Sequence, residues 1–391
     1  MMTVGIEKMR FATSNLYLDM TDLAHARGED PNKYLLGIGQ TEQAVVPPSQ
    51  DAVTLAANAA EQLLTKQERA EIAEIIVATE SGVDHSKSVA IYVQRLLELN
   101  RYARAIELKQ ACYSGTFGLM QARDYVSLHP DKKVLVIATD IARYGLNTSG
   151  EVTQGAGAVA MLVSANPQIA VINDDSQFMT ADIMDFWRPV DHDKALVDGK
   201  YSANVYRDFF KEVWQRYQDT TGLTLTDFDA MVFHLPFTKM GLKALRDVLP
   251  ETDEAHAASL LAAFEASRVY SKRVGNLYTG SLYLSLLSLL ANDTQLRGGQ
   301  RIGMFSYGSG AEGEFFSLTL APTFKAGLDV LGMEKLLDQR QQLSVPAYEE
   351  LFEGALWGSA DQKAQSKQDP AHFVLTGVQN QQRQYRRQTR D

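Results

Sequence analysis

The feature that most constrains the fold of this sequence is a series of parts that occurs twice along the chain. In each half, a strand-like apolar run ends at a polar residue, Glu80 and then His234, and a helix-forming segment follows, beginning at Cys112 and then at Asn276. A Gly-x-Gly turn then leads into another strand-like run, at residues 155–157 and at residues 308–310. This order suggests two copies of one fold. Any α/β chain offers many strand and helix pairs, so chance similarity stays open, but the coincident positions carry chemically useful side chains.

Segments rich in Val, Ile and Ala alternate with longer helical patterns, which predicts a layered α/β architecture. These runs are almost continuously apolar, as expected for strands that are covered by helices on both faces. They lie at residues 73–79, 133–140, 158–164, 228–234 and 301–308.

We place the boundary between the two halves near Pro167, which gives domains of residues 1–167 and 168–391. The aromatic segment at about 180–225 is predicted to be an insertion that forms a cap or pocket wall. The basic, Gln-rich stretch 379–391 is predicted to be a solvated, frayed tail.

Composition excludes several classes of protein. A chain of 391 residues with 45% hydrophobic and 22% charged residues is typical of a globular protein. The net charge of −10 argues against a nucleic-acid surface. No secretory signal is visible at the N-terminus, and the apolar stretch 281–291 is about half of the roughly 20 residues that cross a bilayer. We therefore expect a cytoplasmic protein with no membrane partner.

Cys112 is the only cysteine, so it can form neither an internal disulfide nor a zinc site made of several thiolates. Its residue type alone leaves two roles open, a small core residue or a reactive thiol. If the thiol faces the N-terminus of the following helix, its pKa is expected to fall below the usual value of about 8.5. A thiol of this kind is a usable nucleophile at neutral pH.

Glu80 and His234 each follow an apolar strand, at the edge of the sheet where α/β proteins commonly bind ligands. If water is largely excluded, the pKa of Glu80 should rise, which would make it a better base. Lys239 and Lys243 follow His234 with helical i, i+4 spacing and could clamp the phosphate groups of a ligand, although two solvated surface lysines would look the same.

The run GSGAEG at 308–313 matches a dinucleotide-binding motif literally, but a strand-like EFFSLTL follows it instead of a helix. A tight turn whose backbone N–H groups face an oxyanion fits this context better.

Together, the strings VATESGVDHSKS, KQACYSGTFG, VFHLPFTKMGLKAL, VGNLYTGSLYLSL and FSYGSGAEGEFFSL resemble the 3-hydroxy-3-methylglutaryl-CoA synthase family. The match spans nearly the whole chain in order. Ser114 and His85 depart from the eukaryotic pattern and point to the bacterial branch. The resemblance implies an α/β thiolase-like homodimer of two duplicated βαβαβαββ halves that form a layered αβαβα core. It also implies condensation of acetyl-CoA with acetoacetyl-CoA in the mevalonate pathway of isoprenoid synthesis, with CoA thioesters as substrates and no other cofactor or metal.

Carried onto matching positions, the resemblance implies that Cys112 accepts the acetyl group and that Glu80 removes a proton from its methyl group. His234 would protonate the new alkoxide, and Asn276 would help to hold the acetoacetyl group. Backbone N–H groups of Cys112 and of the turn near Ser306 would bind the acetyl oxygen. Further residues match substrate-pocket positions, namely Ala111, Asp140, Tyr144, Asp185 and Tyr206.

Three alternatives remain at this point. A decarboxylating ketoacyl-acyl-carrier-protein synthase also uses Cys, His and Asn in this order, but it generates its carbanion without a base such as Glu80. A papain-like hydrolase using Cys112 and His234 lacks the family-type sequence around its cysteine. An inactive acyl-CoA-binding relative is disfavoured because all four reactive residues are present.

Overall fold

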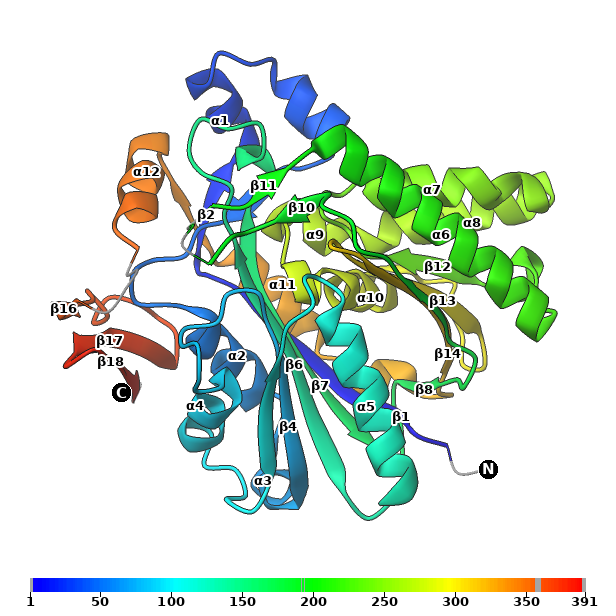
Figure 1. Ribbon diagram of the computed structural model, residues 1–391, viewed down its shortest axis with the longest axis horizontal. Helices are drawn as coiled ribbons and strands as arrows, with labels where there is room; N and C mark the ends of the chain where they lie inside the picture. The colour runs from blue at the N-terminus through cyan, green and yellow to red at the C-terminus, as the bar shows by residue number, and fades with distance from the viewer. Residues whose placement is uncertain (1–2, 191, 193, 356–359, 389–391) are drawn as a thin grey trace.

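The computed structural model describes residues 3–190, 192, 194–355 and 360–388, and a ten-stranded mixed sheet runs through its centre (Figure 1). The first half contributes β1 (Gly5–Ala12), β4 (Ile72–Ala78), β5 (Arg104–Leu108), β6 (Lys133–Ala142) and β7 (Gly155–Ser164). The second half contributes β8 (Ala170–Ile172), β9 (Gln177–Thr180), β12 (Ala230–Phe233), β13 (Arg301–Gly308) and β14 (Glu312–Leu320).

The strand order confirms the predicted duplication. In the first half the order is β5-β4-β6-β7-β1, with β4 parallel to β5 and β6, and β7 antiparallel to both neighbours. In the second half the order is β12-β13-β14-β8, with β12 parallel to β13 and β14 antiparallel to both neighbours. The halves meet where β1 pairs antiparallel with β8. Within the described residues, the second half has no counterpart of β5, so the predicted βαβαβαββ order is complete only in the first half.

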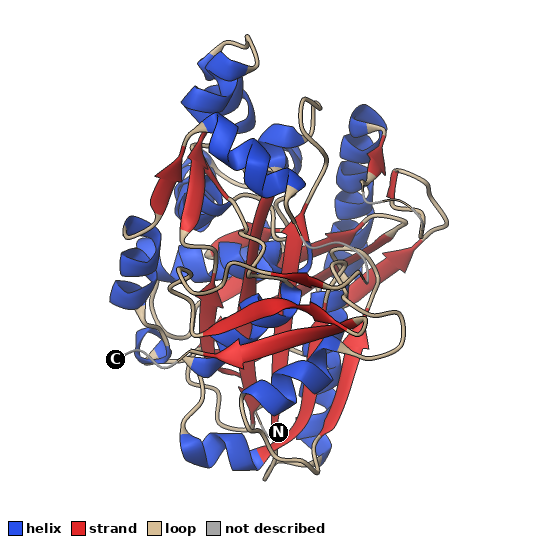
Figure 2. Cartoon of the chain, turned by 90° about the vertical axis from the view of Figure 1, so that its left-hand side faces the viewer, coloured by secondary structure: helices blue, strands red, loops and turns tan. Residues whose placement is uncertain are grey.

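Helices cover both faces of each half and form the predicted five layers. On one outer face lie α2 (Ala52–Glu61), α3 (Lys66–Glu71) and α4 (Val89–Leu96). Between the halves lie α5 (Ser114–Leu128), α9 (Val269–Val274) and α10 (Ser281–Asn292). On the other outer side lie α6 (Gly199–Thr221), α7 (Met240–Val248) and α8 (Glu254–Ser267), at the upper right of Figure 1. Figure 2 shows the strands running through the middle of the molecule with helices around them.

Side-chain alternation along β13 explains why two helical layers can cover one strand. Ile302 and Met304 belong to the main core, which includes the buried leucines of α10. Phe305 and Tyr307 point the other way, into an aromatic cluster that contains the apolar face of α6. Period-2 alternation of this kind places successive side chains on opposite faces of a sheet. In the described part of the chain, no helix has the length and apolarity needed to span a bilayer, and the leucine-rich α10 is a core helix.

Smaller elements surround this core. Among the described residues, three additional sheets form. They pair β15 (Gln341–Leu343) with β2 (Leu16–Asp19) and β3 (Glu42–Ala44), β10 (Phe186–Trp187) with β11 (Leu196–Val197), and β16 (Gln362–Lys363) with β17 (Phe373–Gln379) and β18 (Gln382–Arg387). The remaining helices are α1 (Met20–Ala26), α11 (Val330–Asp338), α12 (Val345–Glu353) and a π-helix at Lys33–Ile38. Short 3-10 turns lie at Glu151–Thr153, Leu225–Asp227, Leu249–Glu251, Tyr278–Gly280 and Phe324–Gly327. The predicted insertion therefore contains the β10–β11 ribbon and α6, while the domain limits stay a prediction.

The prediction of a frayed tail at 379–391 is wrong for residues 382–387, which form β18. This strand pairs with β17, and the hairpin lies against α2 and α4 of the first half. The hydroxyl of Tyr385 donates to the carboxylate of Asp51 at 2.7 Å, and Arg383 forms an ion pair with the same carboxylate at 3.0 Å. Asp51 also caps α2. The tail is ordered because its basic and aromatic side chains have buried partners about 330 residues away in sequence.

Gly155 and Gly157 were predicted to form a turn, but both lie inside β7. They are glycines because another backbone comes close at these positions. A Cβ on Gly155 would lie 2.5 Å from the backbone nitrogen of Asn276, and one on Gly157 would lie 2.8 Å from the carbonyl oxygen of Ala12. Gly155 therefore allows the second half to bring Asn276 against the first, while Gly157 allows the close approach of β1.

Candidate active site

Cys112 lies in the short connection between β5 and α5, two residues before the helix begins. Ala111 has a φ of +41°, in the left-handed region that few residues other than glycine adopt. This local conformation helps turn the chain so that the thiol of Cys112 meets a carboxylate of the first half. The Sγ atom donates to Oε1 of Glu80 at 3.2 Å. The two residues that the sequence predicted to work together are therefore in direct contact.

The predicted lowering of the thiol pKa is wrong. Burial raises the pKa of Cys112 well above its usual value, and the neighbouring Glu80 carboxylate raises it further. Asp140 and Asp185 act in the same direction. Burial and the nearby carboxylates both act against the helix N-terminus, which carries only about half a charge. The resting thiol is consequently protonated and donates its hydrogen to Glu80.

The pKa of Glu80 is raised, as predicted. Burial is the largest cause, and the nearby Asp140 adds to it, whereas the hydrogen bond from Cys112 and the charge of Arg188 lower the pKa. A carboxylate with a raised pKa is a stronger base towards a weak carbon acid.

Asp140 holds the site together without contacting the thiol. Its carboxylate is fully buried and accepts five hydrogen bonds of 2.6–3.1 Å. The donors are the hydroxyls of Thr79 and Ser81, the backbone N–H of Glu80, and both the backbone N–H and the hydroxyl of Thr279. Thr279 belongs to the second half, so this one carboxylate ties the Glu80 turn to the segment that precedes α10.

His234 directly follows β12, and its backbone N–H donates to the carbonyl of Phe305 at 2.9 Å. Its side chain is 2% exposed, and within the described residues its buried Nδ1 atom has no hydrogen-bond partner. Burial lowers the pKa of His234 to about 3, so the ring is neutral at physiological pH. A buried polar atom without a partner is costly, which suggests that a ligand supplies one. Tyr206 donates its hydroxyl to the His234 carbonyl at 2.8 Å and so supports the histidine backbone.

Asn276 is held in one orientation. Its side-chain oxygen accepts from the backbone N–H of Tyr278 and from the hydroxyl of Ser281, both at 2.8 Å. Its amide nitrogen therefore points to the hydroxyl of Tyr144, 3.1 Å away. The rings of Tyr144, Phe186 and Tyr278 lie edge to face with centroids 6.0–6.2 Å apart and form an aromatic wall beside this amide.

Two other predicted substrate contacts, Asp185 and Ser306, form hydrogen bonds within the protein, and their contact with substrate stays a prediction. Asp185 is fully buried and accepts from the Gly310 backbone N–H and from the hydroxyls of Tyr307 and Ser202. It thereby fixes the turn between β13 and β14. Ser306 lies within β13 and not in that turn, and its hydroxyl accepts from Thr116 of α5 at 2.8 Å. That contact places the end of β13, which lies beside His234 after β12, against the first turn of α5.

The predicted phosphate clamp lies on the surface near the start of α7. Lys239 immediately precedes this helix, and its ammonium group donates to the Leu36 carbonyl. The ammonium of Lys243 lies 5.7 Å from the ring centroid of Phe237. No described contact joins either lysine to Cys112, so their role stays a prediction.

Sequence reasoning missed Arg188, Thr279 and Ser81. Ser81 follows Glu80 directly, and Thr279 lies three residues after Asn276, so both could have been found by inspecting the neighbours of the predicted site residues. Arg188 carried a weaker signal, since it is one of several cations in the aromatic segment, and its guanidinium donates to the Glu80 carbonyl.

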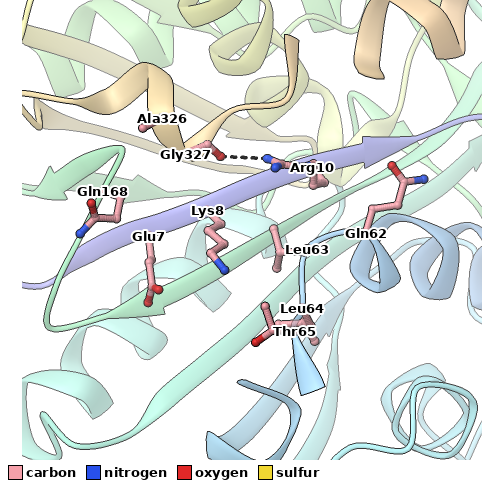
Figure 3. Close-up of a pocket in the computed structure, with 10 residues that line it drawn as sticks. All are labelled: Glu7, Lys8, Arg10, Gln62, Leu63, Leu64, Thr65, Gln168, Ala326 and Gly327. Carbon is pink, nitrogen blue, oxygen red and sulfur yellow. Dashed lines mark hydrogen bonds between the residues drawn. The ribbon is translucent and has the colours of Figure 1, made fainter. Parts of the chain in front are cut away.

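A shallow pocket of about 290 Å³ lies elsewhere, beside β1, where Arg10 donates to the Gly327 carbonyl (Figure 3). None of the predicted site residues lines it.

Comparison with known proteins gives a consistent result. Residues 2–168 match the family model described as hydroxymethylglutaryl-coenzyme A synthase N terminal, and residues 255–388 match its C-terminal counterpart. The chain is 49% identical over 385 residues to hydroxymethylglutaryl-CoA synthase of Enterococcus faecalis, which covers 98% of this chain and 100% of that protein.

Two solved structures are also closely similar. A crystal structure of HMG-CoA synthase complexed with CoA superposes with a TM-score of 0.96 at 43% identity, covering 99% of this chain and 100% of the other. MvaS in complex with 3-hydroxy-3-methylglutaryl coenzyme A gives a TM-score of 0.90 at 37% identity, covering 99% of each chain.

Proposed function

The chain belongs to the hydroxymethylglutaryl-CoA synthase family, and we propose from this premise how its own residues divide the family's condensation between them. It is an acyl-transferring condensing enzyme of thiolase-like fold that acts on CoA thioesters and forms 3-hydroxy-3-methylglutaryl-CoA, a step of the mevalonate pathway. The observation that carries the division of roles is the 3.2 Å contact between Cys112 and Glu80.

In the first step, the sulfur of Cys112 attacks the carbonyl carbon of acetyl-CoA. A new thioester forms on the enzyme, the bond to the CoA sulfur breaks, and CoA leaves with the proton of the thiol. Backbone N–H groups of Cys112 and of the turn near Ser306 stabilise the oxyanion of this step.

In the second step, the Glu80 carboxylate removes a proton from the acetyl methyl group. The resulting carbanion adds to the C3 ketone of acetoacetyl-CoA, and the ketone becomes an alkoxide. The neutral imidazole of His234 and the amide of Asn276 hold this oxygen by hydrogen bonds. His234 gives its N–H proton to the alkoxide, and the proton that Glu80 took from the methyl group replaces it on the ring, so both residues return to their starting state. Water then hydrolyses the Cys112 thioester, which releases the product and restores the thiol.

The buried, unpartnered Nδ1 of His234 supports its place in this scheme, because a substrate oxygen would give that atom the hydrogen-bond partner that it lacks. The orientation of Asn276 supports the same placement, since its amide nitrogen faces the aromatic wall. For Lys239 and Lys243, we retain the proposal that they bind CoA phosphates.

Intact-protein mass spectrometry tests the division of roles. After exposure to acetyl-CoA, the wild-type protein should gain the mass of one acetyl group and lose it when acetoacetyl-CoA is added. Cys112→Ser should keep its melting temperature but gain no acetyl group, since a hydroxyl is a far weaker nucleophile. A large fall in its melting temperature would instead favour a core-packing role for the cysteine.

The Glu80→Ala variant separates the two steps. It should still be acetylated, because removing the neighbouring carboxylate makes the thiol easier to ionise. It should then fail to release the acetyl group as product, because no base removes the methyl proton. Normal condensation by this variant would refute the proposed role of Glu80.

We further propose a homodimer in the cytoplasm, where Cys112 remains a thiol. The strand β5 lies at the end of the sheet and pairs with β4 alone among the described strands. Its Ile106 side chain is 53% exposed, and an open apolar strand edge favours pairing with another chain. Analytical ultracentrifugation should show a dimer that Ile106→Lys weakens, and a monomeric wild-type protein at micromolar concentration would exclude it.

A further inference from the structure

Several acidic side chains lie close enough to the Cys112 thiol to affect its pKa. Its pKa is raised by Glu80, Asp140 and Asp185, each of which is a carboxylic acid in or beside the buried site. Glu80 can act as a base only in its ionised form, and like charges near it oppose ionisation. A positive charge beside Glu80 would therefore matter to the reaction.

Arg188 supplies such a charge. Its Nη2 atom donates to the backbone carbonyl of Glu80, 108 positions earlier in the sequence. The guanidinium also acts electrostatically on the Glu80 carboxyl, in the direction that favours the ionised form. An arginine remains charged at every pH relevant to a protein and holds acceptors with a rigid set of donors.

The segment that carries Arg188 is anchored on both sides of the site. Asp185 binds the backbone N–H of Gly310 at 3.0 Å and the hydroxyl of Tyr307 at 2.9 Å. Phe186, two residues before Arg188, packs edge to face against Tyr144 and belongs to β10. Because these contacts fix Asp185 and Phe186, the guanidinium of Arg188 is held beside the turn at Glu80, which belongs to the other half.

We propose that Arg188 is a positioning residue for the base: it holds the backbone of Glu80 and keeps a positive charge beside its carboxylate during condensation. This inference rests on the proposed role of Glu80 as the base. Arg188 contacts the backbone carbonyl of Glu80, which is not one of the reacting atoms.

The groups around the Glu80 carboxyl determine the expected pH dependence. Asp140 on β6 raises its pKa, Cys112 and Arg188 lower it, and the hydroxyls of Tyr144 and Tyr278 face it from the aromatic wall. Because Glu80 works when deprotonated, removing the arginine charge should move the acidic limb of the condensation rate to higher pH. Opposite charges at close range commonly shift a carboxyl pKa by about 1–3 units, and a partly solvated guanidinium should give about one unit.

The test compares Arg188→Gln, which removes the charge, with Arg188→Lys, which keeps it. Acetyl-enzyme is formed first and confirmed by intact mass, and release of the acetyl group with acetoacetyl-CoA is then measured in single turnover from pH 6 to pH 10. Arg188→Gln should be acetylated fully, should condense about tenfold more slowly below the limb, and should approach the wild-type rate at high pH. Arg188→Lys should restore the position of the limb.

Arg216→Gln makes the same change on the exposed face of α6, where Arg216 donates to Gln177 at 2.7 Å, and serves as the matched control. Two results would refute a role for the positive charge of Arg188. One is a loss of condensation rate in Arg188→Gln that is the same at every pH, and the other is an acidic limb that moves as far in Arg188→Lys as in Arg188→Gln. Glu80→Gln in the same assay separates this inference from its premise. Normal condensation by Glu80→Gln would refute the assignment of Glu80 as the base. If Glu80→Gln were inactive at every pH while Arg188→Gln matched wild type, only the proposed role of Arg188 would be refuted.

Discussion

Replacing Asp140 by Asn tests the contact that joins the two halves of the site. The carboxylate accepts five hydrogen bonds, and two of the donors are the backbone N–H groups of Glu80 and Thr279. An asparagine offers one acceptor oxygen and one amide group that can only donate. The hydroxyls of Thr79 and Ser81 can turn to suit either group, but the two backbone N–H groups cannot.

The stability cost of Asp140→Asn follows from this count. In either amide orientation, at least one buried backbone N–H faces another donor, which costs about 1–3 kcal/mol. Loss of the charge weakens the other hydrogen bonds, since bonds to charged groups contribute about 1.5–3 kcal/mol against about 1 kcal/mol for neutral ones. We expect unfolding in urea to show a loss of about 2–4 kcal/mol with an unchanged m-value.

The same variant should change the pH dependence of condensation. Asp140 raises the pKa of Glu80 by charge repulsion, so removing its charge lowers that pKa. Since Glu80 acts when deprotonated, the acidic limb of the single-turnover rate should move to lower pH, opposite to the effect of Arg188→Gln, while the plateau rate falls. The reasoning would be refuted by a variant as stable as wild type, or by a limb that moved to higher pH.

Three further perturbations have defined outcomes. Tyr385→Phe removes the hydrogen bond to Asp51 and should lower the free energy of unfolding in urea by about 1.5–3 kcal/mol, and a change under 0.5 kcal/mol would show the hairpin contact to be dispensable. Gly115→Ala would place a Cβ 2.7 Å from the backbone carbonyl of Thr279, so it should slow condensation at least about tenfold and lower the melting temperature, and full activity would refute this close approach. Lys243→Gln should raise KM for CoA thioesters about three- to tenfold with kcat unchanged if the lysine binds phosphate, and an unchanged KM would refute that role.

The positions of Glu80 and His234 could be predicted because each follows an uninterrupted apolar run, and such runs end where the backbone leaves the sheet. Cys112 could be placed before a helix by the small residues and apolar pattern that follow it. These are local patterns, and local patterns predict where an element ends. The repeated order of elements then predicted that the two halves share one topology, as the strand order confirms.

The direction in which the pKa of the Cys112 thiol shifts could not be predicted in this way. It depends on the burial of Cys112 and on its contact with a carboxylate 32 positions earlier, and the sequence shows only the helix that follows. The ordered C-terminal hairpin was missed for the same reason, since Tyr385 and Arg383 find their partner at Asp51. The composition of a segment describes that segment alone, whereas the burial of its side chains and their charge pairs depend on the parts of the chain that pack against it.

The contact between Cys112 and Glu80 gives the reaction an order. In the resting enzyme the thiol donates to Glu80, and this hydrogen bond lowers the pKa of the carboxyl against the effect of burial. Acetylation replaces the S–H with a thioester that has no hydrogen to donate. The pKa of Glu80 must then rise, so the carboxylate becomes a stronger base at the moment when a methyl proton comes within its reach. Under the roles proposed for Cys112 and Glu80, the nucleophile therefore restrains the base until it carries the acetyl group, and the proposed function of Arg188 is to keep the strengthened base ionised.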